Sequence, residues 1–114
     1  MRIEDFLTKL RTQPDTVLFT DTMEVIETNY NFIPTRFCNG TAVNEAGTNS
    51  GSCKLFAFAQ LQKLSKEETL ACFGDYYRID VLQNPEATNH ANIRNFMLTG
   101  WEGISFDAKA LQEK

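Results

Sequence analysis

The sequence lacks the long apolar runs and paired cysteines that mark membrane proteins and disulfide-rich proteins. No stretch approaches the roughly 18 apolar residues that a membrane span requires, and the N-terminal stretch MRIEDFLTKL has no long apolar core of a signal peptide. The three cysteines, Cys38, Cys53 and Cys72, contain no C-x-x-C pair. This odd count argues against a disulfide framework and favours a reducing compartment. We expect a soluble chain of the cytoplasm without a membrane partner.

Clustered positive charge is also missing. The chain has 11 Lys and Arg residues against 15 Asp and Glu residues, and no basic patch would attract a phosphate backbone, so we expect no nucleic acid partner. The cysteines and His90 lack the short ligand spacing of structural zinc sites. Gly47 and Gly51 are not followed by the Gly-Lys-Ser/Thr of a phosphate-binding P-loop. We therefore expect neither a metal nor a cofactor.

The composition is that of one globular domain spanning residues 1–114. Hydrophobic residues make up 42% of the chain and charged residues 23%, which is ordinary for a folded domain. Apolar residues recur at helical spacing over residues 3–11 and again over residues 20–30. Pro14 and Pro34 follow these two segments and are expected to end them.

Short strands are predicted between and after the helices. Asn39-Gly40 lies between two short runs and tolerates the positive φ angles of a two-residue hairpin turn. Residues 104–106 are the candidate third strand, and the tail after Phe106 is expected to be frayed. Over residues 53–64 the polar side chains are scattered around the helical wheel, and a helix without a polar face belongs in the centre of a fold.

The second half of the chain is predicted to be helical. Ser65 and Glu68 match a capping box, which predicts a helix that starts there, continues through Gly74 and ends before Pro85. A shorter helix follows, capped by Asn89, ended by Gly100, and with Trp101 folding back onto Phe96. The predicted fold class is α+β, with a helix-dominated single domain and a small two- or three-stranded antiparallel sheet.

A glycine- and serine-rich loop precedes the predicted central helix, in the stretch NEAGTNSGSCK. Its small residues let backbone N–H groups converge, and the N-terminus of a helix carries about half a positive charge. The loop therefore favours an anion, which is either a small anionic ligand or the thiolate of Cys53. The binding residues predicted here are Gly47, Asn49, Ser50, Gly51 and Ser52.

Cys53 and His90 are the candidate catalytic residues. A cysteine in the first turn of a helix has its thiolate stabilised. The stretch NEAGTNSGSCK also resembles, over less than a dozen residues, the Gly-Ser-Cys nucleophile region of papain-like and transglutaminase-like enzymes. A nucleophilic cysteine needs a base, and the chain has one histidine. The loop amides and Asn49 would supply an oxyanion hole. Candidate orienting partners are Asn92, Asn95 and Asp107.

Each of these residues also has an ordinary structural interpretation. Free cysteines are mostly buried and act as small hydrophobes, which applies to Cys53 as well as to the other two. A histidine at a helix start is commonly a capping or network residue. Gly47 and Gly51 suit a tight turn before a central helix. Nothing in the residues themselves decides between these interpretations.

Tyr76 and Tyr77 indicate an interaction surface. Each has an apolar body and a polar tip suited to contact with a partner. Asp75 and Asp80 flank them, and solvated charge is the expected state of these carboxylates. The tyrosines therefore join the loop as predicted binding residues.

Four stretches resemble the HopJ type III effector family: NFIPTRFCNG, NEAGTNSGSCKLFAFAQL, LACFGDYYRIDVL and NHANIRNFMLTGWEGISF. Together they span most of the chain. The resemblance implies a bacterial protein made in the cytoplasm, which either is translocated into a host cell by type III secretion and acts in virulence or has a role inside the bacterium. The family's biochemical activity is uncharacterised, so the resemblance supplies no catalytic residues.

The residues and the resemblance together leave two classes of function. The first is an effector or regulatory protein that binds a partner protein, host proteins included, through the loop and the tyrosines. The second is a small cysteine-dependent hydrolase or transferase with Cys53 as nucleophile and His90 as base. We favour the first class.

Overall fold

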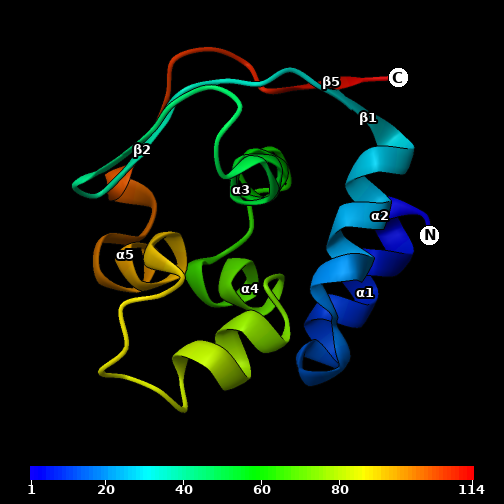
Figure 1. The fold of residues 1–114 in the computed structure, drawn as a ribbon. Coiled ribbons are helices and arrows are strands. Elements are labelled where there is room, and N and C mark those ends of the chain that lie inside the picture. The colour runs from blue at the N-terminus through cyan, green and yellow to red at the C-terminus, as the bar shows by residue number, and fades with distance from the viewer.

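The computed structural model describes residues 1–114, and helix α3 (Ser50–Leu61) runs through the middle of the fold (Figure 1). Helices α1 (Ile3–Thr12) and α2 (Phe19–Asn29) lie on one side of α3 and α5 (Ala91–Thr99) lies on the other. The short helix α4 (Lys66–Ala71) follows α3 directly. This arrangement confirms that the helix without a polar face is central, because α3 is covered on both sides.

The core is built from aromatic rings around Phe56 of α3. The centroid of its ring lies 5.0 Å from that of Phe96, 5.5 Å from that of Phe73 and 6.0 Å from that of Phe37. Trp101 completes the group at 6.4 Å, and it also packs edge-on against Phe96 at 5.1 Å, as predicted. Such aromatic pairs stabilise a core beyond the area that they bury.

Five short strands form two antiparallel sheets, which confirms the α+β class. The three-stranded sheet has the order β3-β2-β4, and its third strand is the predicted segment. A two-stranded sheet joins β1 to β5. The strands are β1 (Tyr30–Phe32), β2 (Phe37–Asn39), β3 (Ala42–Asn44), β4 (Ile104–Phe106) and β5 (Leu111–Glu113).

The prediction of a frayed tail after Phe106 is wrong. Leu111 is 1% exposed and Ala110 is 3% exposed, and the backbone of β5 pairs with β1 in the register Phe32 to Leu111. Burial of these two side chains and the strand pairing together order the C-terminal segment. In Figure 1 the last strand lies beside the strand that follows α2.

The hairpin is present, but its turn lies one residue later than predicted. Asn39 pairs with Ala42, so the two-residue loop is Gly40-Thr41. Asn39 instead ends β2 with its side chain fully buried, where its Nδ2 donates to the backbone oxygen of Asn92 at 2.8 Å. Gly40 supplies the positive φ of 62° that opens the turn.

The single helix predicted before Pro85 is interrupted. α4 ends at Ala71, Gly74 has a φ of 64°, and the chain then forms the π-helix η2 (Tyr76–Val81). A Cβ atom at Gly74 would lie 2.6 Å from the backbone nitrogen of Phe19. The break therefore results from close approach of the two backbones, which only glycine permits.

Two helices begin at residues other than those predicted. α3 starts at Ser50, three residues before Cys53, with Asn49 as N-cap residue. α5 starts at Ala91, with His90 in place of Asn89 as N-cap residue. Both N-cap residues are left-handed, at φ 49° and φ 55°, a conformation that is uncommon outside glycine. The predicted end of α5 is confirmed, since Gly100 follows Thr99 with a φ of 58°.

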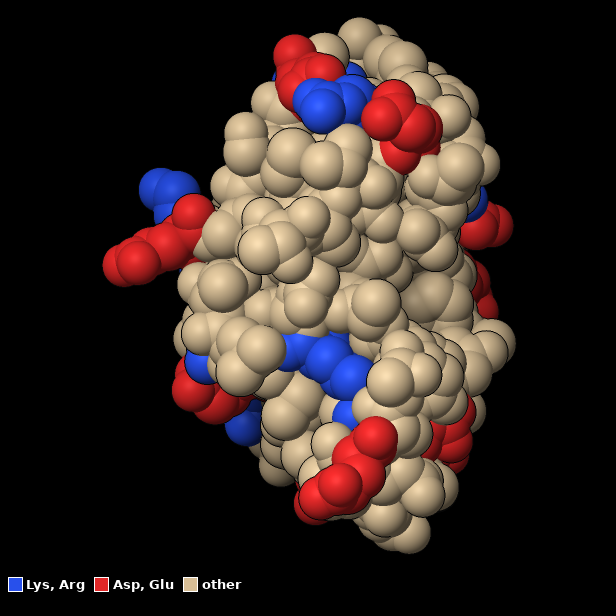
Figure 2. Space-filling model, turned by 60° about the vertical axis from the view of Figure 1, so that its left-hand side comes forward, with Lys and Arg blue, Asp and Glu red and all other residues tan.

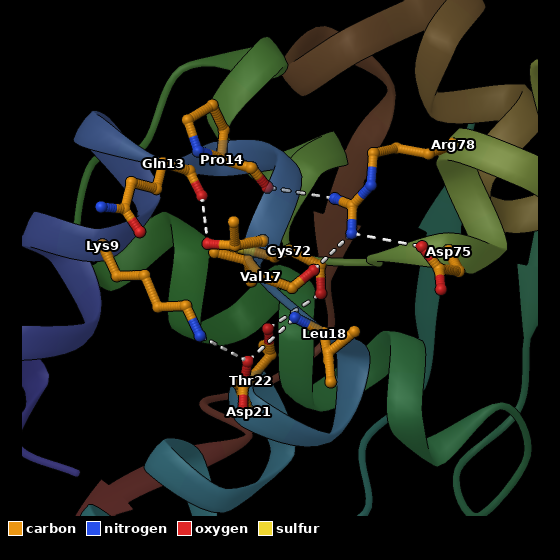
Figure 3. Close-up of polar contacts among 11 residues, drawn as sticks. Lys9, Gln13, Pro14, Val17, Leu18, Asp21, Thr22, Cys72, Asp75 and Arg78 are labelled. Atoms are coloured by element: carbon orange, nitrogen blue, oxygen red, sulfur yellow. Dashed lines mark hydrogen bonds and ion pairs between the residues drawn. The ribbon is translucent and has the colours of Figure 1, made fainter.

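Arg78 of η2 fixes this segment to the junction between α1 and α2 (Figure 3). Its Nη1 donates to the backbone oxygen of Pro14 at 3.1 Å, and its Nη2 donates to that of Val17 at 2.6 Å. Asp75 neutralises the guanidinium at 3.3 Å. Figure 3 shows the Arg78 side chain reaching across to the turn that contains Pro14 and Val17.

The start of α2 is held by Asp21 in the same region (Figure 3). Its carboxylate accepts from the backbone N–H of Leu18 at 2.9 Å and from Lys9 Nζ at 3.2 Å. The hydrogen bond from Leu18 lowers the pKa of Asp21; burial opposes this shift, and Lys9 adds to it. Thr22 donates to the backbone oxygen of Cys72 at 2.8 Å and so joins α2 to the end of α4.

We expect Gly74→Ala to lower the free energy of unfolding by at least about 3 kcal/mol, because the new Cβ adds a backbone clash to the strain of a positive φ. Gly47→Ala is the matched control: Gly47 has a φ of 89°, but a Cβ there would meet nothing within 4 Å. The free energy of unfolding of this control should fall by only about 1 kcal/mol. Urea unfolding measures both variants, and equal losses would contradict the close-approach explanation.

We expect Asp21→Asn to reduce the dependence of stability on acid pH. Because the pKa of Asp21 is lowered in the folded state, its contribution is complete above the unfolded value near 3.9 and is lost as pH falls through the folded value. The variant should be about 1 kcal/mol less stable at pH 7 and should approach the wild type in strong acid. Asp15→Asn is the control, because Asp15 is an exposed carboxylate without an ion pair. Its difference in stability from the wild type should not change between pH 7 and strong acid.

Candidate functional site

A pocket of about 340 Å³, with both polar and apolar walls, lies where α3 and α5 begin. One wall consists of aromatic side chains from α2 and from the segment that follows α4, and the other consists of the first residues of the two helices. The pocket brings together three of the predicted loop residues, one of the tyrosines and the histidine. Its lining residues are Phe19, Asn49, Gly51, Ser52, Phe73, Tyr76, His90, Ala91, Asn92 and Ile93.

Backbone N–H groups from both helix starts converge on this pocket. The side chains of the N-cap residues Asn49 and His90 make no capping hydrogen bond, and the N–H groups of Gly51–Ser52 and Asn92–Ile93 have no acceptor within the chain. Each helix start carries a partial positive charge. Two such ends beside one pocket make a site suited to an anion.

A network of asparagine side chains holds the two helix starts together. Asn44 and Asn92 exchange two amide hydrogen bonds, at 3.2 and 3.0 Å. Asn49 donates to Asn44 Oδ1 at 2.7 Å, and Asn39 donates to Asn92 Oδ1 at 3.0 Å. Asn39, Asn44 and Asn92 are buried, and buried amide networks position the groups attached to them. The loop before α3 and the start of α5 are thereby joined through the hairpin.

His90 is held at the edge of the pocket by Asp80 and Tyr76. Its Nε2 lies 3.0 Å from Asp80 Oδ2, and its ring centroid lies 5.2 Å from that of Tyr76. Phe19 packs edge-on against the other side of Tyr76 at 5.2 Å. These contacts match the interpretation of His90 as a network residue, although its side chain does not cap α5.

Cys53 lies outside the pocket, in the core. It is 2% exposed, and its Sγ–H donates to the backbone oxygen of Thr35 at 3.5 Å. Burial raises the pKa of the Cys53 thiol, with a smaller opposing effect from Thr35. Burial also raises the pKa of Cys72, to about 12. Burial therefore outweighs the effect of the helix start, and the thiolate of Cys53 is disfavoured.

The structure does not bring Cys53 and His90 together. The two side chains share no hydrogen bond, since one contacts Thr35 and the other Asp80. The candidate orienting residues also have other partners: Asn95 donates to the backbone oxygen of Asn39, and Asp107 pairs with Arg36. A Cys–His mechanism thus has no support from the geometry of the folded chain.

The remaining predicted binding residues are dispersed. Gly47 and Ser50 do not line the pocket. Tyr77 lines a separate hollow of about 530 Å³ with Arg11 and Arg78, both of which are bonded to other groups. Residues that sequence reasoning missed are Phe19, Phe73, Ala91 and Ile93. No local pattern marks them, because their role depends on contacts between distant segments.

We expect Cys38 to be the only cysteine that iodoacetamide modifies readily in the folded protein near pH 8. Cys38 is half-buried, whereas Cys53 and Cys72 are buried with raised pKa values, and it is the accessible thiolate that reacts. Mass spectrometry identifies each modified site, and unfolding in urea is the positive control. Modification of Cys53 that is rapid and is lost in His90→Ala would instead support the catalytic pair.

Comparison with known proteins identifies one family and one closely similar solved structure. The family model described as HopJ type III effector protein matches residues 3–111. The crystal structure of "unknown function protein VPA0580" superimposes with a TM-score of 0.98 at 54% sequence identity, covering 100% of this chain and 95% of that one. No curated protein matches the sequence.

None of the helices combines the length and the apolar character needed to cross a bilayer.

Proposed function

The chain belongs to the HopJ type III effector protein family, and we propose that it acts by binding a partner protein that inserts an anionic group into the pocket between α3 and α5. The family description covers type III effectors and specifies no reaction. A binding function needs a preformed site with unused donors, and this pocket has one. The helix starts supply the donors, and the aromatic wall supplies apolar contact area.

The observation that carries this proposal is the convergence of two uncapped helix starts on one pocket. The unused N–H groups of Gly51–Ser52 and Asn92–Ile93 come from segments 40 residues apart in sequence, and the buried asparagines fix their relative position. The carboxylates nearest the pocket do not compete for these donors, because Asp80 pairs with His90 and Asp75 pairs with Arg78. An incoming carboxylate or phosphate group would meet positive potential.

The rim of the pocket suits a protein partner. Leu18 and Tyr76 are 47% and 45% exposed, and with Phe19 they line a shallower hollow that adjoins the pocket. Tyrosines with an apolar body and a free hydroxyl are frequent anchors in interfaces. The partner would therefore place an anionic side chain in the pocket and apolar side chains against Leu18 and Tyr76.

We further propose that the protein is made in the bacterial cytoplasm, is translocated by type III secretion, and meets its partner in the host cell as part of virulence. Family membership supports this proposal. The cysteine-dependent alternative has no observation in its favour, since burial keeps the Cys53 thiol away from the pocket.

We expect inorganic phosphate to shift the backbone amide resonances of Gly51, Ser52, Asn92 and Ile93 in a saturable manner. Ser52→Glu should weaken this binding at least about tenfold, because it places a carboxylate among the donors. The substitution should leave the fold intact, since acidic residues stabilise the first turn of a helix. Two-dimensional NMR at constant ionic strength measures the dissociation constants.

Ser50→Glu is the matched control. It adds the same charge to the same helix start, but Ser50 does not line the pocket. Phosphate binding should fall much less in Ser50→Glu than in Ser52→Glu. Equal weakening in the two variants, or shifts spread evenly over the protein, would mean that only general electrostatic attraction is present and would overturn the proposal.

A further inference from the structure

A second hollow, of about 340 Å³, lies along the C-terminal half of α5 and is mainly apolar. Its walls come from the end of η2 and the loop after it on one side and from α5 on the other. It shares no lining residue with the anion pocket. We call it the α5 groove, and it is lined by Val81, Leu82, Pro85, Arg94, Met97 and Leu98.

The outer face of α5 is apolar where a solvated helix would be polar. Ile93 and Phe96 point into the core, while Arg94, Met97 and Leu98 follow at the i, i+3 and i+4 spacing of a neighbouring face. Leu98 is 82% exposed, more than any other large hydrophobic residue, and Leu82 across the groove is 48% exposed. Exposed apolar side chains gathered around a groove mark an interaction site.

Arg94 gives the groove an uncompensated positive charge. Its guanidinium donates to the backbone oxygen and Oδ1 of Asn89, at 2.6 and 2.9 Å, and more weakly to the backbone oxygens of Pro85 and Asp80, both at 3.5 Å. All of these acceptors are neutral. Every other arginine has a carboxylate partner: Arg2 with Glu4, Arg11 with Glu68, Arg36 with Glu45 and Asp107, and Arg78 with Asp75.

The neighbouring carboxylates do not neutralise Arg94. The Asp80 carboxylate lies 3.0 Å from His90 Nε2 and forms no ion pair with Arg94. Glu86, in the loop beside Pro85, is exposed and forms no ion pair. The guanidinium is thus held rigidly at the groove by neutral groups, which leaves its charge available to an external anion. Figure 2 shows the side of the molecule that carries α5, where basic atoms lie in a hollow with uncharged surface above them and an acidic side chain below them.

We propose that the α5 groove binds an amphipathic helix of a partner protein, with the apolar face of that helix on Leu82, Met97 and Leu98 and an aspartate or glutamate on Arg94. A groove between two helical segments accepts a third helix whose anchors recur every three or four residues. The single fixed positive charge selects a helix with a carboxylate beside these anchors. The groove is thereby a second binding surface, independent of the anion pocket.

The test is selection of a displayed library of helical peptides against the full chain. The library keeps leucines at helical spacing on one face and randomises the flanking positions. We expect enrichment of Asp or Glu at one flanking position. Selected peptides should bind Arg94→Gln at least about tenfold more weakly, as expected for loss of a charged hydrogen bond. Selection against Arg94→Glu should instead enrich Lys or Arg at that position.

Matched variants locate the binding site. Leu98→Gln should abolish binding of the selected peptides, whereas Leu61→Gln, at a leucine that is 46% exposed and outside the groove, should not change it. Ser52→Glu should leave peptide binding intact, which separates this proposal from the anion pocket.

Equal binding to Leu98→Gln, or no acidic preference among selected peptides, would overturn the proposal. A concentration-dependent dimer that Leu98→Gln dissociates would also overturn it, since the occupant would then be a second copy of the chain.

Discussion

Burial of the middle of α3, from Leu55 to Ala59, is the constraint on which the rest of the structure depends. A helix with an almost continuous apolar surface from Leu55 to Ala59 must be covered by other elements. The chain meets this need by placing α1 and α2 on one side and α5 on the other (Figure 1). The ring of Phe56 contacts rings from the hairpin, from the segment after α4 and from α5, while the ring of Phe58 contacts that of Phe6 in α1. The first turn of α3 lies beside the first turn of α5, where the asparagine network joins them.

The parts of the fold that could be predicted from the sequence are those set by local patterns, and the parts that could not are set by contacts between distant segments. The helices over residues 3–12 and 19–29 each carry one apolar stripe, and such a stripe is a local signal. The break at Gly74 was not predictable, since its cause is the backbone of Phe19, more than 50 residues earlier. The strand Leu111–Glu113 was missed for the same reason, because its partner strand begins at Tyr30.

The candidate site shows the same division between local and distant causes. Small residues before α3 are a local signal for converging N–H groups, but the second helix start beside them is positioned by Asn44 and Asn92, 48 residues apart. The sequence pattern places Cys53 in the first turn, because the apolar run begins there. The helix begins at Ser50 instead, and within its first residues Ser52 lines the pocket whereas Cys53 is buried in the core. Successive residues of an α-helix are rotated by about 100°, so neighbouring positions such as these can face the pocket and the core.

The π-helix η2 places side chains in three different hollows. Tyr76 lines the anion pocket, Tyr77 and Arg78 line the hollow beside α1, and Val81 lines the α5 groove. A π turn contains one residue more than an α turn, and an α-helix rotates by about 100° per residue. Deletion of a single residue here would turn the tyrosines and the groove wall relative to each other, although no buried side chain of α3 would change. The length of this one turn therefore sets the relative orientation of all three surfaces, and variation in that length is a route by which related chains could alter their partners while keeping the same core.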